Sequence, residues 1–426
     1  LYYGWYIVAT TLFIAFATTG ARNAFGIFVI PMSDDFGWSH GTISLAASIG
    51  FLVNGLTQPF LGGIFDRVGG RKVILVSMVI VGIATVALSL TFHILFLVFM
   101  FGFVASSALS GASLTNTGAL LARWFRRKRA TVVGLNAAGA SLGSLLLVPF
   151  AMYLLQATNW RVTWVAMGLI ILVLALPLAF IFIRDDPRKL GLQPDGGPNT
   201  SDGGAQGATD QQGGPLETDQ WRQCFRSLPI WQMSGSYFIC GFTTAVLSVH
   251  FVPHAIDQGV SGSMAATIFG VMMGLNALGS IGAGMLSDRF NRKNLLALVY
   301  FCRGCAYILL LLVPGSQGLW AFAAIAGFSW IATAPLTTAL TADVYGLRAL
   351  GAISGMSFVF HQVGGASSIL LAGYLYDLTG SYTIPFAIAG ALLFPAALSA
   401  FTIQERKYSM RYQREPRHVG AIATGD

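Results

Sequence analysis

The sequence predicts an all-α membrane protein with twelve spanning helices arranged as two six-helix bundles. The first observation is composition: 55% of the residues are hydrophobic, only 10% are charged, and the mean hydropathy is +0.68. The second is a series of apolar segments, each of about twenty residues, which is the length needed to cross a bilayer. Soluble domains carry about 25% charged residues. Water-soluble enzymes and disordered scaffolds are therefore excluded.

The apolar segments fall into two sets of six, numbered here as spans 1 to 12. The first set covers residues 5–31, 41–64, 73–92, 94–120, 130–156 and 162–183. The second set covers residues 230–256, 264–286, 294–313, 318–341, 351–375 and 382–403.

A polar segment between the two sets divides the chain. Its middle, residues 194–215, consists largely of Gly, Asp, Gln, Thr and Pro, a composition that cannot bury a core. We therefore expect four parts, which are an N-terminal bundle (1–190), a flexible cytoplasmic linker (191–224), a C-terminal bundle (225–405) and a basic cytoplasmic tail (406–426).

Basic residues indicate the orientation. The net charge is +8, and most Lys and Arg residues follow spans 2, 4 and 8 or lie in the linker and the tail. All of these segments share one side of the membrane, which the positive-inside rule assigns to the cytoplasm, together with both termini. Since topology explains the positive charge, nucleic-acid binding is not expected.

The two halves also resemble each other. The pattern Gly-Gly-Ile-Phe-Asp-Arg-Val-Gly-Gly-Arg-Lys after span 2 is echoed by Gly-Met-Leu-Ser-Asp-Arg-Phe-Asn-Arg-Lys after span 8. The same spacing separates Asp66 from Asp288 and Gly143 from Gly365. A repeat of six spans is typical of transporters whose halves pivot around a site near the middle of the membrane.

The loop after span 2 resembles the signature of the major facilitator superfamily, and the likeness extends over nearly the whole chain. Tyr3-Gly4-Trp5, Ala122-Arg123-Trp124-Phe125 and the segment that begins Asp186-Pro187 resemble bacterial relatives of monocarboxylate transporters and oxalate/formate antiporters. The resemblance implies a secondary transporter, not an enzyme, in the bacterial inner membrane. It would move a small organic anion such as lactate or pyruvate by alternating access, with proton coupling left open.

Two departures from that family concern charge. In span 8, where the monocarboxylate carriers have an Asp and an Arg, this chain has Asn276 and Ser280. Late in span 1, where they have a Lys, it has Asn23, preceded by Arg22. We therefore expect the anion-binding charge to have moved or the substrate to differ.

Arg22 is the first candidate for substrate contact, because a guanidinium suits bidentate capture of a carboxylate. Its alternative role is snorkelling to the interface or pairing with Asp34 or Asp257.

The other candidates are polar residues inside spans. Buried polar groups in lipid need partners, so each binds either substrate or a neighbouring helix. Histidine can also relay a proton. His250 lies near His254 and Asp257, and this trio forms either an outer gate or a solvated helix end. The candidates are Asn23, Asn116, Asn276, Ser280, His250, His361 and Arg303.

The repeated loop residues are candidates for gating. We expect them to form latches that close the cytoplasmic face, although solvated positive-inside charge explains the basic members equally well. The gating candidates are Asp66, Arg67, Arg71, Asp288 and Arg289.

Other functions receive less support. The main alternative is a proton-driven exporter or importer of a larger or less charged amphiphilic solute. A receptor that has lost transport would not need the repeated latches, and a membrane enzyme would need clustered catalytic groups that the sequence lacks. We expect a monomer in the lipid bilayer, with no cofactor and no metal. The four cysteines do not form a disulfide framework.

Overall fold

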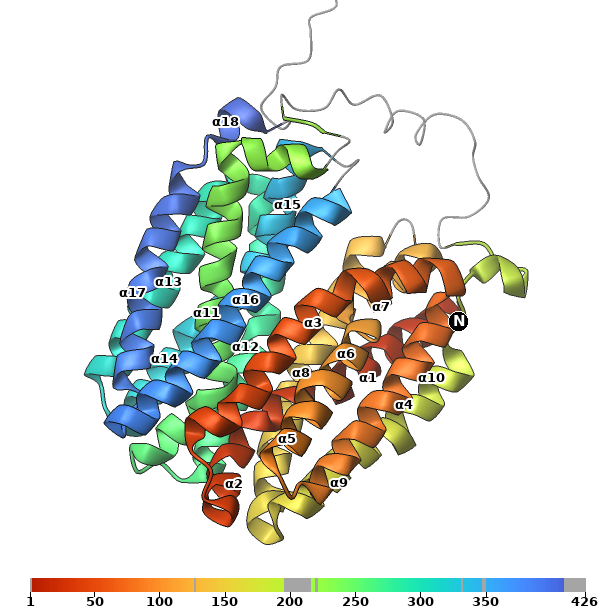
Figure 1. The fold of residues 1–426 in the computed structure, drawn as a ribbon. Coiled ribbons are helices and arrows are strands. Elements are labelled where there is room, and N and C mark those ends of the chain that lie inside the picture. The colour runs from red at the N-terminus through yellow and green to blue at the C-terminus, as the bar shows by residue number, and fades with distance from the viewer. Residues whose placement is uncertain are drawn as a thin grey trace, which may run out of the picture.

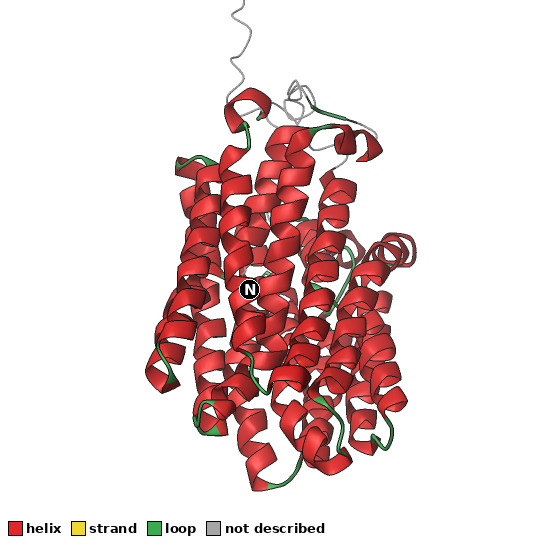
Figure 2. Ribbon diagram, turned by 60° about the vertical axis from the view of Figure 1, so that its left-hand side comes forward, coloured by secondary structure: helices red, strands yellow, loops and turns green. Residues whose placement is uncertain are grey.

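The computed structural model describes residues 2–125, 128–194, 216–218, 221–330, 332–346 and 350–409. Within these ranges the side chains of Asp66, Arg129, Ala130, Gly284, Asp288 and Gly351 are not described. The regular elements of the described residues are all helices (Figure 2). Twelve of the resulting helical segments are long and apolar enough to cross a membrane, which confirms the predicted fold class.

The N-terminal half contains spans 1 to 6. Its elements are α1 (Gly4–Asn23), η1 (Ala24–Phe28), α2 (Val29–Phe36), α3 (His40–Val68), α4 (Gly70–Ala87), η2 (Leu88–Leu90), α5 (Ile94–Leu97), η3 (Val98–Ala105), α6 (Ser106–Gly111), α7 (Leu114–Trp124), α8 (Arg129–Ala157), α9 (Trp160–Leu169), η4 (Ile170–Ala175), α10 (Leu176–Phe182) and η5 (Pro187–Leu190).

The C-terminal half contains spans 7 to 12. Its elements are η6 (Trp221–Arg226), α11 (Leu228–Asp257), α12 (Gly262–Arg289), α13 (Arg292–Leu312), α14 (Gly315–Ser329), α15 (Thr333–Tyr345), α16 (Leu350–Thr379), α17 (Thr383–Thr402) and α18 (Glu405–Tyr408).

Span 1 is longer than the sequence suggested, and this changes the depth of Arg22. The predicted span stopped at Pro31, but the helix continues to Phe36 after the short 3₁₀ segment η1. A proline in the first turn of a helix costs little, because its missing N–H would have no intrahelical partner there. Arg22 therefore lies near the middle of a span from Gly4 to Phe36, not in its outer part.

The two halves lie side by side and touch chiefly along two pairs of helices, with a smaller contact between η1 and α11 (Figure 1). α3 packs against α16, and α8 packs against α12. These are spans 2 and 11 and spans 5 and 8, so the contact between halves follows the repeat. The remaining spans pack mainly within their own half.

Very close helix crossings occur at equivalent places in the two halves of the repeat. α1 crosses α8 where Gly143 lies against the backbone carbonyl of Phe16. α11 crosses α16 where Gly364 lies against the backbone carbonyl of Phe238. A side chain at either glycine would collide with that backbone. Lipid supplies no hydrophobic drive between helices, so such close backbone contact is what holds each half together.

Arg71 ties the start of α4 to the end of span 6. Its backbone N–H donates to the Asp185 carboxylate at 2.6 Å, and its Nη2 donates to the carbonyl of Phe180 at 2.8 Å. A carboxylate at a helix N-terminus satisfies N–H groups that have no partner within the helix. Arg71 therefore binds within its own half.

Lys293 makes the equivalent contacts in the C-terminal half. Its backbone N–H donates to the Glu405 carboxylate at 3.0 Å, and its Nζ donates to the carbonyl of Phe401 at 2.8 Å. The repeat therefore extends to hydrogen bonds that fasten spans 3 and 9 to spans 6 and 12.

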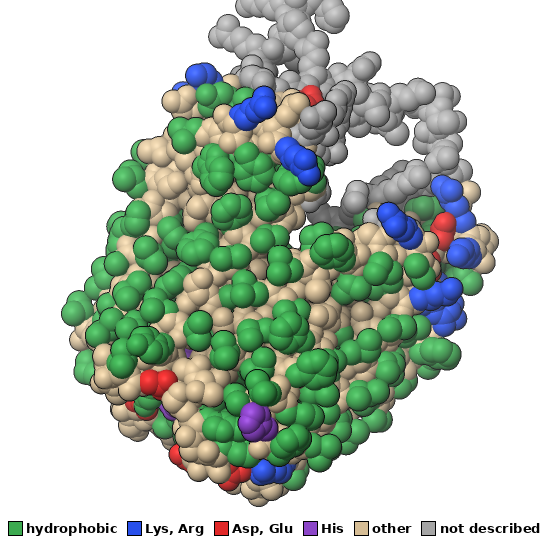
Figure 3. Space-filling model, in the orientation of Figure 1, with side chains coloured by type: hydrophobic (Ala, Val, Ile, Leu, Met, Phe, Trp, Pro, Cys, Tyr) green, Lys and Arg blue, Asp and Glu red, His purple; other side chains and the backbone are tan. Residues whose placement is uncertain are grey.

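Lys and Arg side chains gather mainly at the upper end of the molecule in Figure 3. We call this the basic end; α1 begins there and α18 lies there (Figure 1). The opposite end holds the start of α3 and the loops after α11 and α16, and we call it the outer end.

The described parts of the predicted linker pack against the two halves. Tyr2 Oη donates to the carbonyl of Gln193 at 3.0 Å, next to the N-terminal half. In η6, Cys224 is only 2% exposed, and burial raises the pKa of its thiol. Ser227, which follows η6, bonds Tyr345 at 2.5 Å. The middle of the predicted linker and the tail beyond residue 409 lie outside the described residues.

We expect Gly143→Leu to lower the free energy of unfolding by at least about 1–3 kcal/mol, because the new side chain would push α1 away from α8. Thermal unfolding of the purified protein in detergent measures this change. Gly134→Leu on the same helix is the matched control, because no atom lies within 4 Å of a side chain there. Equal melting temperatures for the two variants would contradict the proposed role of the crossing.

Candidate functional site

The two halves meet at the outer end and diverge toward the basic end (Figure 1). On α3, the bonds to the other half start at His40, whose Nδ1 lies 2.8 Å from Tyr382 Oη. Farther in, Asn54 Oδ1 accepts from Gln362 Nε2 at 2.9 Å. Beyond this point α3 carries exposed residues such as Phe60, and Figure 3 shows a notch between the halves.

The contact between α8 and α12 likewise runs from the outer end to mid-depth and not beyond. Ser263 Oγ donates to Gln156 Oε1 at 2.7 Å near the outer end. Asn276 Nδ2 donates to Ser141 Oγ at 3.1 Å near mid-depth. Farther toward the basic end, α12 carries exposed residues such as Met285. The molecule is therefore open at its basic end, above two polar bridges at mid-depth.

Arg22 is the last residue but one of α1, before the 3₁₀ segment of span 1. Its guanidinium carbon lies 4.3 Å from the centre of the Phe51 ring on α3. Its Nη2 is buried and has no hydrogen-bond partner among the described residues. A buried N–H group without a partner is rare in proteins, so this group calls for an acceptor such as water or a ligand.

Asn23, the next residue, is already occupied by the protein. Its Nδ2 donates to Ser144 Oγ on α8 at 2.8 Å. Asn276 is 2% exposed and bridges the halves through Ser141, and Ser280 Oγ donates to Asn276 Oδ1 at 3.4 Å. The two span 8 candidates therefore act together, as neighbours one turn apart.

A buried amide pair that the sequence did not single out completes the mid-depth contact. Asn54 Nδ2 donates to Ser110 Oγ at 2.8 Å, and Gln362 Nε2 donates to the carbonyl of Phe51 at 3.2 Å as well as to Asn54. His361 Nδ1 lies 3.2 Å from Gln362 Oε1. In the sequence, Asn54 was visible as an asparagine inside an apolar span. Its role could be recognised only once the structure placed α16 opposite it.

Asn116 satisfies the backbone at a break in span 4. α6 ends at Gly111 and α7 begins at Leu114. Asn116 Nδ2 donates to the carbonyls of Ser110 and Gly111 at 3.0 and 3.2 Å. These carbonyls have lost their intrahelical donors, so the side chain replaces them.

Arg303 performs the same task at a break in span 10, where α14 ends at Ser329. Its Nη2 donates to the carbonyls of Ser329 and Trp330, the latter at 2.8 Å. Its Nη1 lies 3.5 Å from both Cys240 Sγ and Thr243 Oγ1 on α11. Arg303 is 0% exposed, so this arginine is fully enclosed by protein groups.

His250 lies apart from the mid-depth residues. It is 0% exposed and sits at the outer end, where α11 meets α3 and Tyr382. The structure thus separates the candidates into three places: the mid-depth contact, the helix breaks and the outer end.

The predicted gating latch can be followed only in part. The side chains of Asp66 and Asp288 lie outside the described residues, while Arg67 and Arg289 are exposed. Arg71 binds the end of span 6 within its own half.

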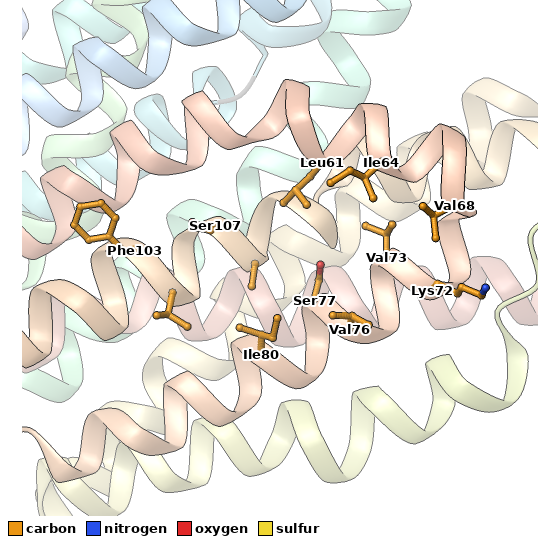
Figure 4. Close-up of a pocket in the computed structure, with 12 residues that line it drawn as sticks. Leu61, Ile64, Val68, Lys72, Val73, Val76, Ser77, Ile80, Phe103 and Ser107 are labelled. Atoms are coloured by element: carbon orange, nitrogen blue, oxygen red, sulfur yellow. The ribbon is translucent and has the colours of Figure 1, made fainter.

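A groove of about 540 Å³ lies on the surface of the N-terminal half, between α3, α4 and the η3–α6 segment (Figure 4). Its walls are apolar, with Lys72 at one end, and many lining side chains such as Val76 are exposed on the membrane-facing surface. None of the candidate substrate residues lines it. We therefore do not assign the substrate site to this groove.

We expect Arg303→Met to lower the free energy of unfolding by about 2–4 kcal/mol, because two buried carbonyls at the break would lose their donor. Thermal unfolding in detergent measures the loss. Arg161→Ala serves as the control, since its ion pair with Asp35 is about half exposed. An unchanged melting temperature for Arg303→Met would remove the structural role assigned to this residue.

The sequence matches the profile of the Major Facilitator Superfamily over residues 11–369. It is 27% identical to the uncharacterized MFS-type transporter YcxA of Bacillus subtilis (strain 168), over 90% of this chain and 91% of that protein. It is 26% identical to monocarboxylate transporter 13 of Bos taurus, over 92% of this chain and 87% of that protein. It is 27% identical to monocarboxylate transporter 11 of Homo sapiens, over 92% and 81%.

The fold resembles that of solved structures. A bacterial homologue of the human lysosomal transporter Spinster, in an inward-facing and unoccupied conformation, aligns with a TM-score of 0.73 at 17% identity, over 97% of this chain and 99% of that chain. The inward-facing and occupied structure of such a homologue gives 0.71 at 16% identity, over 98% and 99%. With the family profile covering most of its length, this twelve-span chain belongs to the Major Facilitator Superfamily of transporters.

Proposed function

We propose that this protein carries a small organic anion, a monocarboxylate such as lactate or pyruvate, across the bacterial inner membrane by alternating access. The observation that carries this proposal is the unpartnered Nη2 of Arg22, buried near the middle of span 1. A carboxylate would supply the missing acceptor and the missing negative charge together.

The surroundings of Arg22 suit a small, partly apolar anion. Phe51 covers one side of the guanidinium, so a carboxylate must approach from the other. Phe51, which contacts Arg22, lies one turn before Asn54, whose bond to Gln362 joins α3 to α16. A solute bound there would touch both halves and could be released when they separate.

The names of the relatives support an organic anion as the substrate class and do not identify the particular anion. Several are named monocarboxylate transporters, at identities of about one quarter. In span 8 this chain has the neutral pair Asn276 and Ser280. We therefore assign the substrate-binding charge to Arg22 in span 1.

The conformation corresponds to an inward-facing state. The positive-inside rule assigns the basic end to the cytoplasm, and the halves are separated at that end. In the opposite state the basic end closes, and we assign Arg67 and Arg289, with Asp66 and Asp288, to the latch that holds it shut. Proton coupling is part of this proposal and is developed below.

A second candidate substrate is a larger, less charged amphiphile. The neutral polar pair in span 8 and the uncharged bridge between Asn54 and Gln362 favour it, because both offer hydrogen bonds without charge. Uptake of labelled L-lactate, described next, separates the two candidate substrates.

We expect Arg22→Met to reduce uptake of labelled L-lactate into proteoliposomes at least about tenfold, the usual cost of losing a charge-assisted hydrogen bond. The melting temperature should stay equal or rise, because the substitution removes an unpaired buried charge and keeps an apolar contact with Phe51. Arg161→Ala at the outer end is the control and should transport normally.

Normal lactate uptake by Arg22→Met would remove Arg22 from the binding site. No lactate uptake by the folded wild-type protein, with or without an inward proton gradient, would instead favour the larger amphiphile.

A further inference from the structure

The outer end contains a hydrogen-bonded chain of two histidines and a tyrosine that links the halves. His40 Nδ1 lies 2.8 Å from Tyr382 Oη, and His250 Nδ1 lies 3.3 Å from the same oxygen. His40 belongs to the N-terminal half, and Tyr382 and His250 to the C-terminal half. All three are buried, with 9%, 1% and 0% exposure respectively.

The partners of His250 determine which of its nitrogens carries hydrogen. Nε2 lies 3.1 Å from the carbonyl oxygen of Ile369, which can only accept. It also lies 3.5 Å from Ser44 Oγ, whose own hydrogen is donated to the carbonyl of His40 at 2.6 Å. Nε2 therefore donates, and in the neutral ring Nδ1 accepts.

The donors and acceptors of the other two hydrogen bonds are then fixed. Tyr382 donates its single hydrogen to His250 Nδ1, so His40 Nδ1 must donate to Tyr382 Oη. Burial raises the pKa of the Tyr382 hydroxyl, which keeps it protonated. In this arrangement both histidines are neutral.

One additional proton on His250 reverses this arrangement. Its Nδ1 becomes a donor to Tyr382 Oη, and the tyrosine hydrogen turns to His40 Nδ1. The resulting imidazolium is enclosed with no exposed surface. Burying an unpaired charge is costly, and this cost disappears when the halves separate and water enters.

Two acidic groups lie near His40. Asp377 of α16 and Asp34 of α2 are close enough to His40 to act on it electrostatically, and Asp377 accepts from the N–H of Gly41 at 2.9 Å. Burial opposes a charge on His40, and these carboxylates offset part of that cost.

The other ionisable groups around the cluster have partners of their own. Tyr376 stacks on His40 at 4.2 Å and donates to Asp257 at 3.3 Å. His254 packs edge-on against Phe386 and bonds Gln258 at 3.0 Å.

We propose that His40, Tyr382 and His250 form a proton-binding site that holds the outer gate closed when neutral and opens it when a proton binds. This inference deepens the transport proposal, since it names the groups through which an external proton promotes the outward-open state. A proton arriving on Nε2 of His40 moves inward as two transfers. The Nδ1 proton of His40 passes to Tyr382 Oη while the Tyr382 proton passes to His250 Nδ1, and no net hydrogen is lost.

Hydrogen–deuterium exchange of the substrate-free protein in lipid nanodiscs, at pH 7.5 and 5.5, tests this site. After correction for intrinsic exchange, protection of residues 40–55 and 366–379 should fall below about pH 6.5, the ordinary titration range of histidine, by up to about tenfold per pH unit for one proton. The sign follows because the open gate binds the proton and the closed gate excludes it. Residues 73–85 of α4, which pack within one half, provide the reference.

Three variants sharpen the result. His250→Gln keeps an N–H donor but cannot take up a proton, so protection should stay high at both pH values. Tyr382→Phe removes the shared hydroxyl, so protection should already be low at pH 7.5. His93→Gln, an exposed histidine elsewhere at the outer end, should respond like the wild type.

A wild type without any pH response, or a His250→Gln variant with the full response, would overturn the proposal. If His250→Gln does not fold, high protection of Tyr382→Phe at pH 7.5 would do so instead. Because no substrate is present, the exchange result stands apart from lactate uptake. A pH response that His250→Gln abolishes, in a protein that does not transport lactate, would retain the gate and reject the substrate.

Discussion

The lack of water in the hydrocarbon core is the constraint on which this structure depends. A helix break in lipid frees carbonyl groups, and each must find a donor inside the protein. Span 4 obtains its donor from Asn116 and span 10 from Arg303. These two breaks occupy equivalent spans of the repeat. The donors hold the breaks in place, so the interior near mid-depth keeps a defined shape.

The same constraint separates what is rigid from what can move. Within each half, helices touch backbone to backbone, as at Gly143 and Gly364, and these contacts tolerate little displacement. Between the halves, the contact ends at mid-depth in single side-chain hydrogen bonds. These are the bonds of Asn54 with Gln362 and of Asn276 with Ser141. Bonds of this kind can break and re-form at modest cost. The halves can therefore pivot as bodies, which alternating access requires.

Two buried arginines show why environment decides a role that residue type leaves open. Arg303 is surrounded by carbonyl, hydroxyl and thiol groups of its own half and serves the protein backbone. Arg22 has an aromatic ring on one side and an Nη2 without a described partner. Of these two arginines, only the second has a buried guanidinium nitrogen without an acceptor among the described residues. The histidines divide similarly, since His361 joins the mid-depth network and His250 the cluster at the outer end.

The sequence by itself determined the number of spans, the division into two halves and the repeat, because hydropathy and spacing along the chain suffice for these. It also indicated Arg22 as a polar group that lipid would not tolerate without a purpose. The tertiary structure alone decided that Asn54 meets Gln362, that Arg303 serves a helix break and that His40 shares Tyr382 with His250. Each of these pairs joins residues far apart in the chain, and a side chain's partner depends on which helix face lies opposite it.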